Sequence, residues 1–163
     1  DGTPVTAHDY EFGWKRTLDP GNGTNIPNYL FDIRGARDLH QRLSSDPASV
    51  GIRATGDYTL TVELERPAGY FLHLAGILLP VPRHVIQRYG ERWTDPATLV
   101  TNGPFRLETF EPQRRLVLVR NSGYTGRFAG NLQRVELDLD LESDPDRLSS
   151  RYAAGERARG GGQ

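Results

Sequence analysis

Two closely spaced prolines, Pro80 and Pro82, constrain the fold of this chain more than any other feature of its sequence. Proline has no N–H to donate within a helix or a central strand, and it biases the residue before it towards extended backbone. The Leu79-Pro80-Val81-Pro82 segment is therefore expected to be an extended crossing between two lobes. The resulting domains are residues 1–82, residues 83–156, and a flexible Gly-rich tail at residues 157–163.

The residues before this crossing contain a strong helix signal. Thr6 is a favourable N-cap residue, and Asp9 stands three positions later in a variant of the capping box. Apolar side chains then recur at the i, i+4 and i+8 positions of one helix face, namely Tyr10, Trp14 and Leu18. We expect this face to pack into the core, and the helix to end at the turn residues 19–23.

Alternating apolar and polar residues predict half-buried strands in both lobes. One hairpin is expected from residues 51–54 and 59–64, and another from residues 105–110 and 115–120. The strand at 115–120 is apolar on both faces, so it should be central in its sheet. Further elements are a strand at 135–142 and helices at 28–33, 36–43, 70–74, 83–89 and 144–154. In the helix at 36–43, Leu39 and Leu43 should face inward. The fold class is therefore α/β in the broad sense, with mixed α+β elements.

The balance of charge argues against two classes of partner. The 20 basic and 21 acidic residues give no basic patch for nucleic acid or for an anionic membrane surface. Cysteine is absent, which excludes disulfides and cysteine-ligated metals. Methionine is also absent, so we expect the chain to be a segment of a longer protein.

Neither a metal site nor a catalytic site is indicated. The four histidines, His8, His40, His73 and His84, match no zinc spacing, and we expect surface or packing roles for them. The alternating acids at 138–146 lack the glycine that a calcium loop requires at its sixth position, where Ser143 stands. No nucleophile elbow, Walker loop or dinucleotide fingerprint is present. We therefore expect no enzyme activity, no cofactor and no bound metal.

Several short motifs occur together in one order. They are Asp1-Gly2-Thr3-Pro4-Val5-Thr6-Ala7-His8-Asp9 with Trp14 and Arg16, the hairpin residues 57–62, the Pro80-Val81-Pro82 crossing, Thr101-Asn102-Gly103-Pro104-Phe105, and Arg151-Tyr152-Ala153-Ala154-Gly155-Glu156. In this order and spacing the chain resembles the extracytoplasmic solute-binding proteins of ABC importers, in the oligopeptide, dipeptide and nickel-binding family. Two departures are Asn121-Ser122-Gly123-Tyr124-Thr125, where the family often has Asn-Pro-x-Tyr-Trp, and Arg157-Ala158-Arg159 after Glu156.

The resemblance implies a periplasmic-binding-protein-like type II fold, of which this chain is a fragment. Residues 1–82 would be part of the small inserted lobe, and residues 83–156 part of the first large lobe. The second large lobe, which closes over the ligand in such proteins, would be absent. Ligand binding by hinge closure, with no chemistry, is the activity that the resemblance implies.

The resemblance also implies where a ligand would lie and which partners to expect. Positions near Ile26 and Ala75 correspond to ligand contacts of peptide-binding members, and both are apolar here. Asn28 and Tyr29 follow a loop and match a ligand-proximal region of the family. Trp14 could stack on a ligand, but its helical spacing favours the core.

The expected partners are a small peptide or other small solute and the membrane subunits of an ABC permease, with no nucleic acid. The expected location is periplasmic or extracellular and membrane-associated. Sheet edges without their partner strands favour self-association of the segment. The alternative is a solute-binding-like sensor or interaction domain of a larger regulatory protein, and an enzyme is a third, weaker hypothesis.

Overall fold

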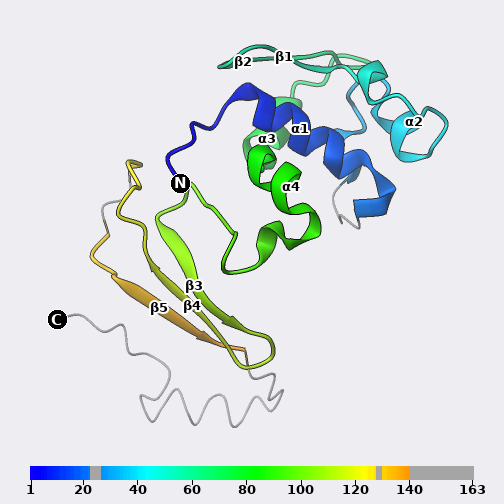
Figure 1. The fold of residues 1–163 in the computed structure, drawn as a ribbon. Helices are drawn as coiled ribbons and strands as arrows, with labels where there is room; N and C mark the ends of the chain where they lie inside the picture. Colours follow the sequence, from blue (N-terminus) through cyan, green and yellow to red (C-terminus); the bar gives the residue numbers. More distant parts are fainter. Residues whose placement is uncertain (23–26, 128–129, 140–163) are drawn as a thin grey trace, which may run out of the picture. The chain divides into compact units, whose positions relative to one another are not determined.

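The computed structural model describes residues 1–22, 27–127 and 130–139. The chain divides into two compact units, Thr3–Gln87 and Asp1–Gly2 with Arg88–Gln163. The unit Thr3–Gln87 contains α1 (Ala7–Leu18), α2 (Ala36–His40), β1 (Ile52–Gly56), β2 (Thr59–Val62), α3 (Phe71–Ile77) and the start of α4 (Arg83–Tyr89). The other unit contains β3 (Phe105–Glu111), β4 (Arg115–Arg120) and β5 (Arg134–Asp138) (Figure 1). Short 3-10 turns lie at Pro20–Asn22, Pro27–Leu30, Pro47–Ser49 and Gly90–Thr94.

The first helix, α1, begins at the cap that the sequence predicts. The backbone N–H and the hydroxyl of Thr6 both donate to one carboxylate oxygen of Asp9, at 2.8 and 3.0 Å. The capping box is thereby confirmed. Trp14 and Leu18 are buried and Tyr10 is half-buried, so the predicted apolar face does pack into the core.

The core of the unit Thr3–Gln87 gathers around Trp14. The indole Nε1 donates to the backbone oxygen of Leu78 at 3.1 Å. The ring meets Tyr10 and Phe71 edge-on, with centroids 6.2 and 6.4 Å apart. Each such aromatic pair contributes about 0.5–1.5 kcal/mol beyond the burial of its apolar area. The other buried residues of this core are Leu18, Leu30, Ile33, Ala36, Val50, Ile52 and Leu78.

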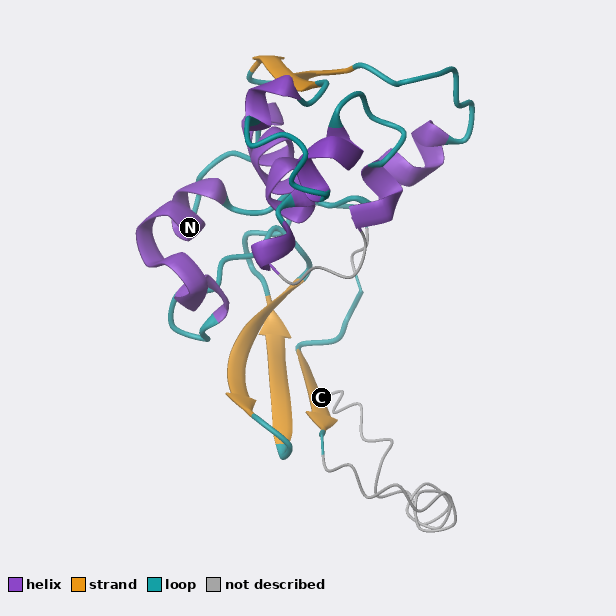
Figure 2. Ribbon diagram, turned by 90° about the vertical axis from the view of Figure 1, so that its right-hand side faces the viewer, coloured by secondary structure: helices purple, strands orange, loops and turns teal. Residues whose placement is uncertain are grey.

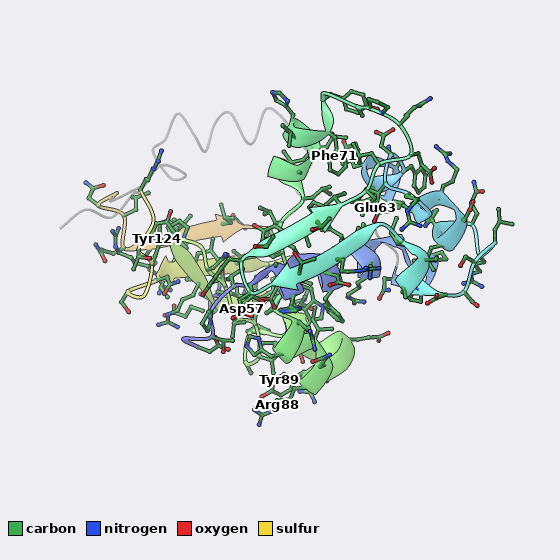
Figure 3. All side chains as sticks on the ribbon, turned by 90° about the horizontal axis from the view of Figure 1, so that it is seen from above. Asp57, Glu63, Phe71, Arg88, Tyr89 and Tyr124 are labelled. Atoms are coloured by element: carbon green, nitrogen blue, oxygen red, sulfur yellow. The ribbon has the colours of Figure 1, made fainter. Side chains whose placement is uncertain are left out.

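The antiparallel hairpin of β1 and β2 is attached to α1 through backbone groups. The N–H of Ala7 donates to the carbonyl of Asp57 at 2.7 Å, and Asp57 lies at the turn of the hairpin (Figure 3). The N–H of Ala54 donates to Oε2 of Glu11 at 2.8 Å. Because an unpaired N–H costs free energy when it leaves water, the Glu11 carboxylate stabilises the contact between helix and hairpin.

The strands β3, β4 and β5 form one antiparallel sheet in that order (Figure 2). The central position of β4 confirms the prediction from its apolar sequence, and Val117 in this strand is only 1% exposed. The register aligns two apolar rows across one face of the sheet. They are Leu107, Leu118 and Val135 in one row, and Phe110, Leu116 and Leu137 in the other.

The expectation that Leu43 faces the core is wrong. The helix α2 ends at His40, and Leu43 is 75% exposed. Arg42 adopts a left-handed φ of 59°, and the N–H of Leu43 turns back to the carbonyl of Asp38 at 2.8 Å. This closing turn ends the helix at His40 and leaves Leu43 exposed to solvent.

The helix expected at 28–33 is replaced by the short 3-10 turn Pro27–Leu30. Ile33 forms an antiparallel bridge with Leu64, and the N–H of Arg34 donates to the carbonyl of Glu63 at 2.9 Å. These contacts need extended backbone, so a helix cannot continue through Ile33. The expected strand residues 140–142, the helix at 144–154 and the tail at 157–163 lie outside the described residues.

Candidate ligand-binding site

A cavity of about 320 Å³ opens within the unit Thr3–Gln87, where α1, the β1–β2 hairpin and α3 meet. The residues that line it include Tyr10 and Trp14 from α1, Tyr58 and Leu60 from the hairpin, and Ala75 from α3. The helical spacing of Tyr10 and Trp14 places both on the same side of α1. The sequence therefore brings aromatic rings to this cavity by the same periodicity that builds the core.

The aromatic wall is held rigidly. Trp14 is 3% exposed, and its hydrogen bond to Leu78 and its edge-on contacts with Tyr10 and Phe71 fix the ring. The prediction of a core role for Trp14 is confirmed, although part of its surface also borders the cavity. By contrast, Tyr58, in the turn between β1 and β2, is 80% exposed.

The walls of this cavity carry no charged side chain. The only side-chain hydroxyl at its margin besides the tyrosines is that of Thr6, which donates to Asp9. Burial acts to raise the pKa of Asp9, but hydrogen bonds from Thr6 and from the N–H of Arg83 outweigh it and keep this pKa below its usual value. Asp9 thus remains an ionised structural group, and the cavity itself offers apolar contact rather than acid, base or nucleophile.

The structure separates the sequence-predicted ligand residues. Ala75 is half-buried and lines the cavity. Asn28 and Tyr29 are exposed on the 3-10 turn Pro27–Leu30 and line neither this cavity nor the second one described below. Ile26 lies outside the described residues. Among the predicted positions, Ala75 alone belongs to the cavity as described.

Tyr58 lines the cavity but was not among the ligand-binding residues predicted from the sequence. The sequence analysis includes it only in the hairpin motif of residues 57–62. The available signal was its residue type, because large aromatic side chains are uncommon in turns that Gly, Asn and Asp favour.

The histidines do not gather into a site. His40 Nδ1 lies 3.0 Å from the carbonyl oxygen of Leu18, and His8 Nε2 lies 3.9 Å from a carboxylate oxygen of Asp57. Within residues 1–22, 27–127 and 130–139, no three His, Cys, Asp or Glu side chains are grouped to hold a metal ion. In the same part of the chain, no helix has the length and apolar character needed to cross a bilayer.

Comparison with protein families gives one match that spans most of the chain. A family described as bacterial extracellular solute-binding proteins, family 5 Middle, matches residues 1–148. The matched part includes every helix and strand described above.

Two relatives are similar over nearly the full chain. The periplasmic oligopeptide-binding protein OppA of Salmonella typhimurium strain LT2 is 34% identical over 159 residues, which cover 96% of this chain and 29% of that protein. The probable deoxycholate-binding periplasmic protein YgiS of Escherichia coli K12 is 35% identical over 160 residues, with the same coverage of 96% and 29%. The chain therefore spans less than a third of the length of these relatives.

Solved structures show the same relationship in three dimensions. OppA of Burkholderia pseudomallei matches with a TM-score of 0.82 at 30% identity, over 95% of this chain and 30% of that one. Haemophilus influenzae OppA in complex with RPPGFSPFR matches with a TM-score of 0.83 at 28% identity, with the same coverage.

Proposed function

The chain belongs to the family 5 bacterial extracellular solute-binding proteins, and from this premise we propose that it forms part of the substrate-binding component of an ABC importer. The family resemblance drawn from the sequence is confirmed, as is the expectation of binding rather than catalysis. The mixed α and β fold class of periplasmic binding proteins is also confirmed, over about 30% of the matched structures.

The proposed ligand is a peptide or another small polar solute. The observation that carries this proposal is the 34% identity to an oligopeptide-binding protein over 159 residues. The similarity to an OppA structure that contains the peptide RPPGFSPFR supports it further. The ligand would act by hinge closure, which it can drive only by binding the closed state more tightly than the open one.

The same proposal covers the domains, the partners and the location. Residues 1–82 would belong to a small inserted lobe, and residues 83–156 to the first large lobe. The binding protein would deliver its ligand to the membrane subunits of an ABC permease, on the periplasmic or extracellular side of the membrane. The periplasmic names of the bacterial relatives support this location.

Calorimetry with mixed di- to pentapeptides tests the proposal. We expect the 163-residue chain alone to bind them weakly, because it spans 29% of its relatives and one side of the proposed cleft would be missing. A gene product that carries this chain together with the remaining lobes should bind peptides with micromolar or tighter affinity. Failure of that longer protein to bind any peptide would remove the peptide proposal, and micromolar binding by the 163-residue chain would remove the requirement for a second lobe.

A second candidate ligand is an amphipathic apolar solute. YgiS, the relative named as a probable deoxycholate-binding protein, is 35% identical, and the cavity at Ala75 is walled by aromatic and aliphatic side chains. Such walls suit a ring system better than a charged peptide. Titration of the longer protein with deoxycholate, followed by peptide competition, distinguishes the two ligands.

A further inference from the structure

A second cavity, of about 580 Å³, lies against another face of α1 and has a different chemical character. Its α1 wall includes His8, Phe12 and Lys15, and its α4 wall consists of Arg83 and Gln87. A cavity of this size lies within the range of roughly 300–1,000 Å³ that small-molecule sites occupy. We call this cavity the α1–α4 groove.

The acidic groups of the α1–α4 groove are already engaged. The two carboxylate oxygens of Glu11 accept from Lys15 Nζ at 2.7 Å and from the N–H of Ala54 at 2.8 Å. Asp19 accepts from the N–H of Gly21 and from the side-chain amide of Asn22, both at 2.9 Å. Each of these four oxygens therefore already accepts one hydrogen bond from the protein.

The donors at the α4 end of the groove are not engaged in this way. Among the described residues, the guanidinium of Arg83 has no hydrogen-bond or ion-pair partner, although the backbone N–H of Arg83 donates to Asp9 at 3.2 Å. That backbone bond ties the start of α4 to α1. Arg83 and Gln87 stand one helical turn apart, as do His8 and Phe12 on α1, so each pair forms one side of this end.

The side chains that line the groove carry a net positive charge. The lining includes three cations, Lys15, Arg16 and Arg83, against the two carboxylates of Glu11 and Asp19, and only Lys15 and Glu11 form an ion pair within it. A guanidinium presents a planar fork that matches a carboxylate bidentately, and charge-assisted bonds of this kind are about twice as strong as neutral ones. The neighbouring Gln87 amide supplies another donor, and the half-buried Phe12 ring supplies an apolar surface.

We infer that the α1–α4 groove binds a carboxylate that carries an adjacent apolar group. Arg83 holds the carboxylate, Gln87 donates to it, and Phe12 packs against the apolar part. This site is separate from the cavity at Ala75 and does not depend on the transport proposal, because neither Arg83 nor Phe12 lines that cavity.

A pair of probes that differ only in the carboxylate tests the inference. N-acetylphenylalanine and N-acetylphenylalaninamide are titrated into the full chain and followed by amide chemical shifts. The acid should bind at least about tenfold more tightly than the amide, since a bond to a charged group is worth roughly 1.5–3 kcal/mol. Shifts should concentrate in residues 8–16 and 83–87.

Two variants separate the groove from general electrostatics. In the Arg83→Gln variant, the affinity for the acid should be within about twofold of the affinity for the amide. The tenfold preference is lost because one charge-assisted contact is removed. Arg53→Gln removes an exposed arginine on β1 that does not line the groove, and it should leave the preference unchanged. Equal binding of acid and amide, or equal losses in the two variants, would overturn the inference.

Peptides identify the source of the carboxylate. N-acetyl-Ala-Ala-Phe with a free C-terminus is compared with its C-terminal amide under the same conditions. A tenfold preference for the free peptide, lost in Arg83→Gln, extends the site to chain termini, whereas a preference confined to N-acetylphenylalanine limits it to small free acids. An unchanged near-ultraviolet circular dichroism signal from the aromatic side chains confirms that the variants remain folded.

Discussion

Gly35 occupies a position where both the backbone and the packing exclude a side chain. Its φ is +71°, in the left-handed region that residues with a Cβ rarely adopt. A Cβ at this position would lie 2.9 Å from the backbone oxygen of Ser49. A backbone oxygen cannot rotate away as the end of a flexible side chain can, so the chain itself would have to shift.

We predict that Gly35→Ala destabilises the fold by about 1–3 kcal/mol, through strained φ and the contact with Ser49. Gly76→Ala is the matched control, because Gly76 lies inside α3 and a Cβ there would meet nothing within 4 Å. The control should stabilise the protein by roughly 0.5–1 kcal/mol through helix propensity. Urea unfolding measures both changes, and a neutral Gly35→Ala variant would refute the packing argument.

At the scale of single residues, the sequence predicted what depends on local spacing. Trp14 and Leu18 follow helical periodicity and are buried as expected. Ala75 was placed by family resemblance and does line a cavity, but its cavity neighbour Tyr58 comes from a hairpin whose packing on α1 no local pattern encodes. For Leu43, local spacing gave the wrong prediction. The apolar periodicity predicts a helix there, but the left-handed backbone of Arg42 interrupts it.

At the scale of elements, two carboxylates connect α1 to its surroundings. Asp9 caps the helix and accepts from the N–H of Arg83 at 3.2 Å. Glu11 accepts from Lys15 and from the N–H of Ala54 in β1. Burial acts to raise the pKa of Glu11, but these hydrogen bonds outweigh it and lower the pKa below its usual value. Both acids are therefore bound more favourably in their ionised form when the protein is folded.

We predict an acid-dependent loss of stability that originates at this helix. A lowered folded-state pKa stabilises the fold fully above the unfolded-state value, about 4 for Asp and Glu, and the contribution disappears as pH falls through the folded value. The Asp9→Asn, Glu11→Gln double variant should therefore be less stable at neutral pH and flatter in its pH dependence below about pH 4.

Thermal unfolding between neutral and strongly acidic pH measures this difference, with Glu91→Gln as the control for removing one exposed carboxylate. Glu111 in the other unit also has a lowered pKa, because Arg115 donates to it, and this background is common to all three proteins. A double variant whose stability falls with acid as steeply as that of the parent would show that Asp9 and Glu11 are not responsible.

The sequence predicted most elements but not all of their ends. The alternation at 59–64 and the two-faced apolar strand at 115–120 identified β2 and the central β4. Helix signals failed at 28–33 because the bridge between Ile33 and Leu64 joins residues 31 positions apart. The apolar periodicity of one or two helical turns carries no information about a contact between residues so far apart in the sequence.

At the scale of the whole molecule, the sheet of the second unit has an apolar face that is open to solvent. Phe110 is 45% exposed and Leu137 is 47% exposed, in the same row as the half-buried Leu116. In the described residues, β3 and β5 each also have one edge without a strand partner. Exposed apolar faces and open edges favour association between chains.

We predict that the 163-residue chain self-associates through this sheet. Sedimentation at rising concentration should show species larger than a monomer, and Leu137→Lys should shift them towards the monomer by placing a charge in the apolar row. Arg106→Gln changes an exposed side chain between two residues of β3 that face the other way, and it should have little effect. A monomer at every concentration would exclude the association.

The attachment of the hairpin to α1 determines the order in which this part of the molecule can mature during synthesis. The bond from Ala54 to Glu11 joins residues 43 positions apart, and the one from Ala7 closes on Asp57. A helix of 12 residues is marginal in water by itself. During synthesis, α1 can pack against Leu30, Ile33 and Ala36 before the hairpin is made, whereas its bonds to the hairpin form only after residues 54–57 have been added.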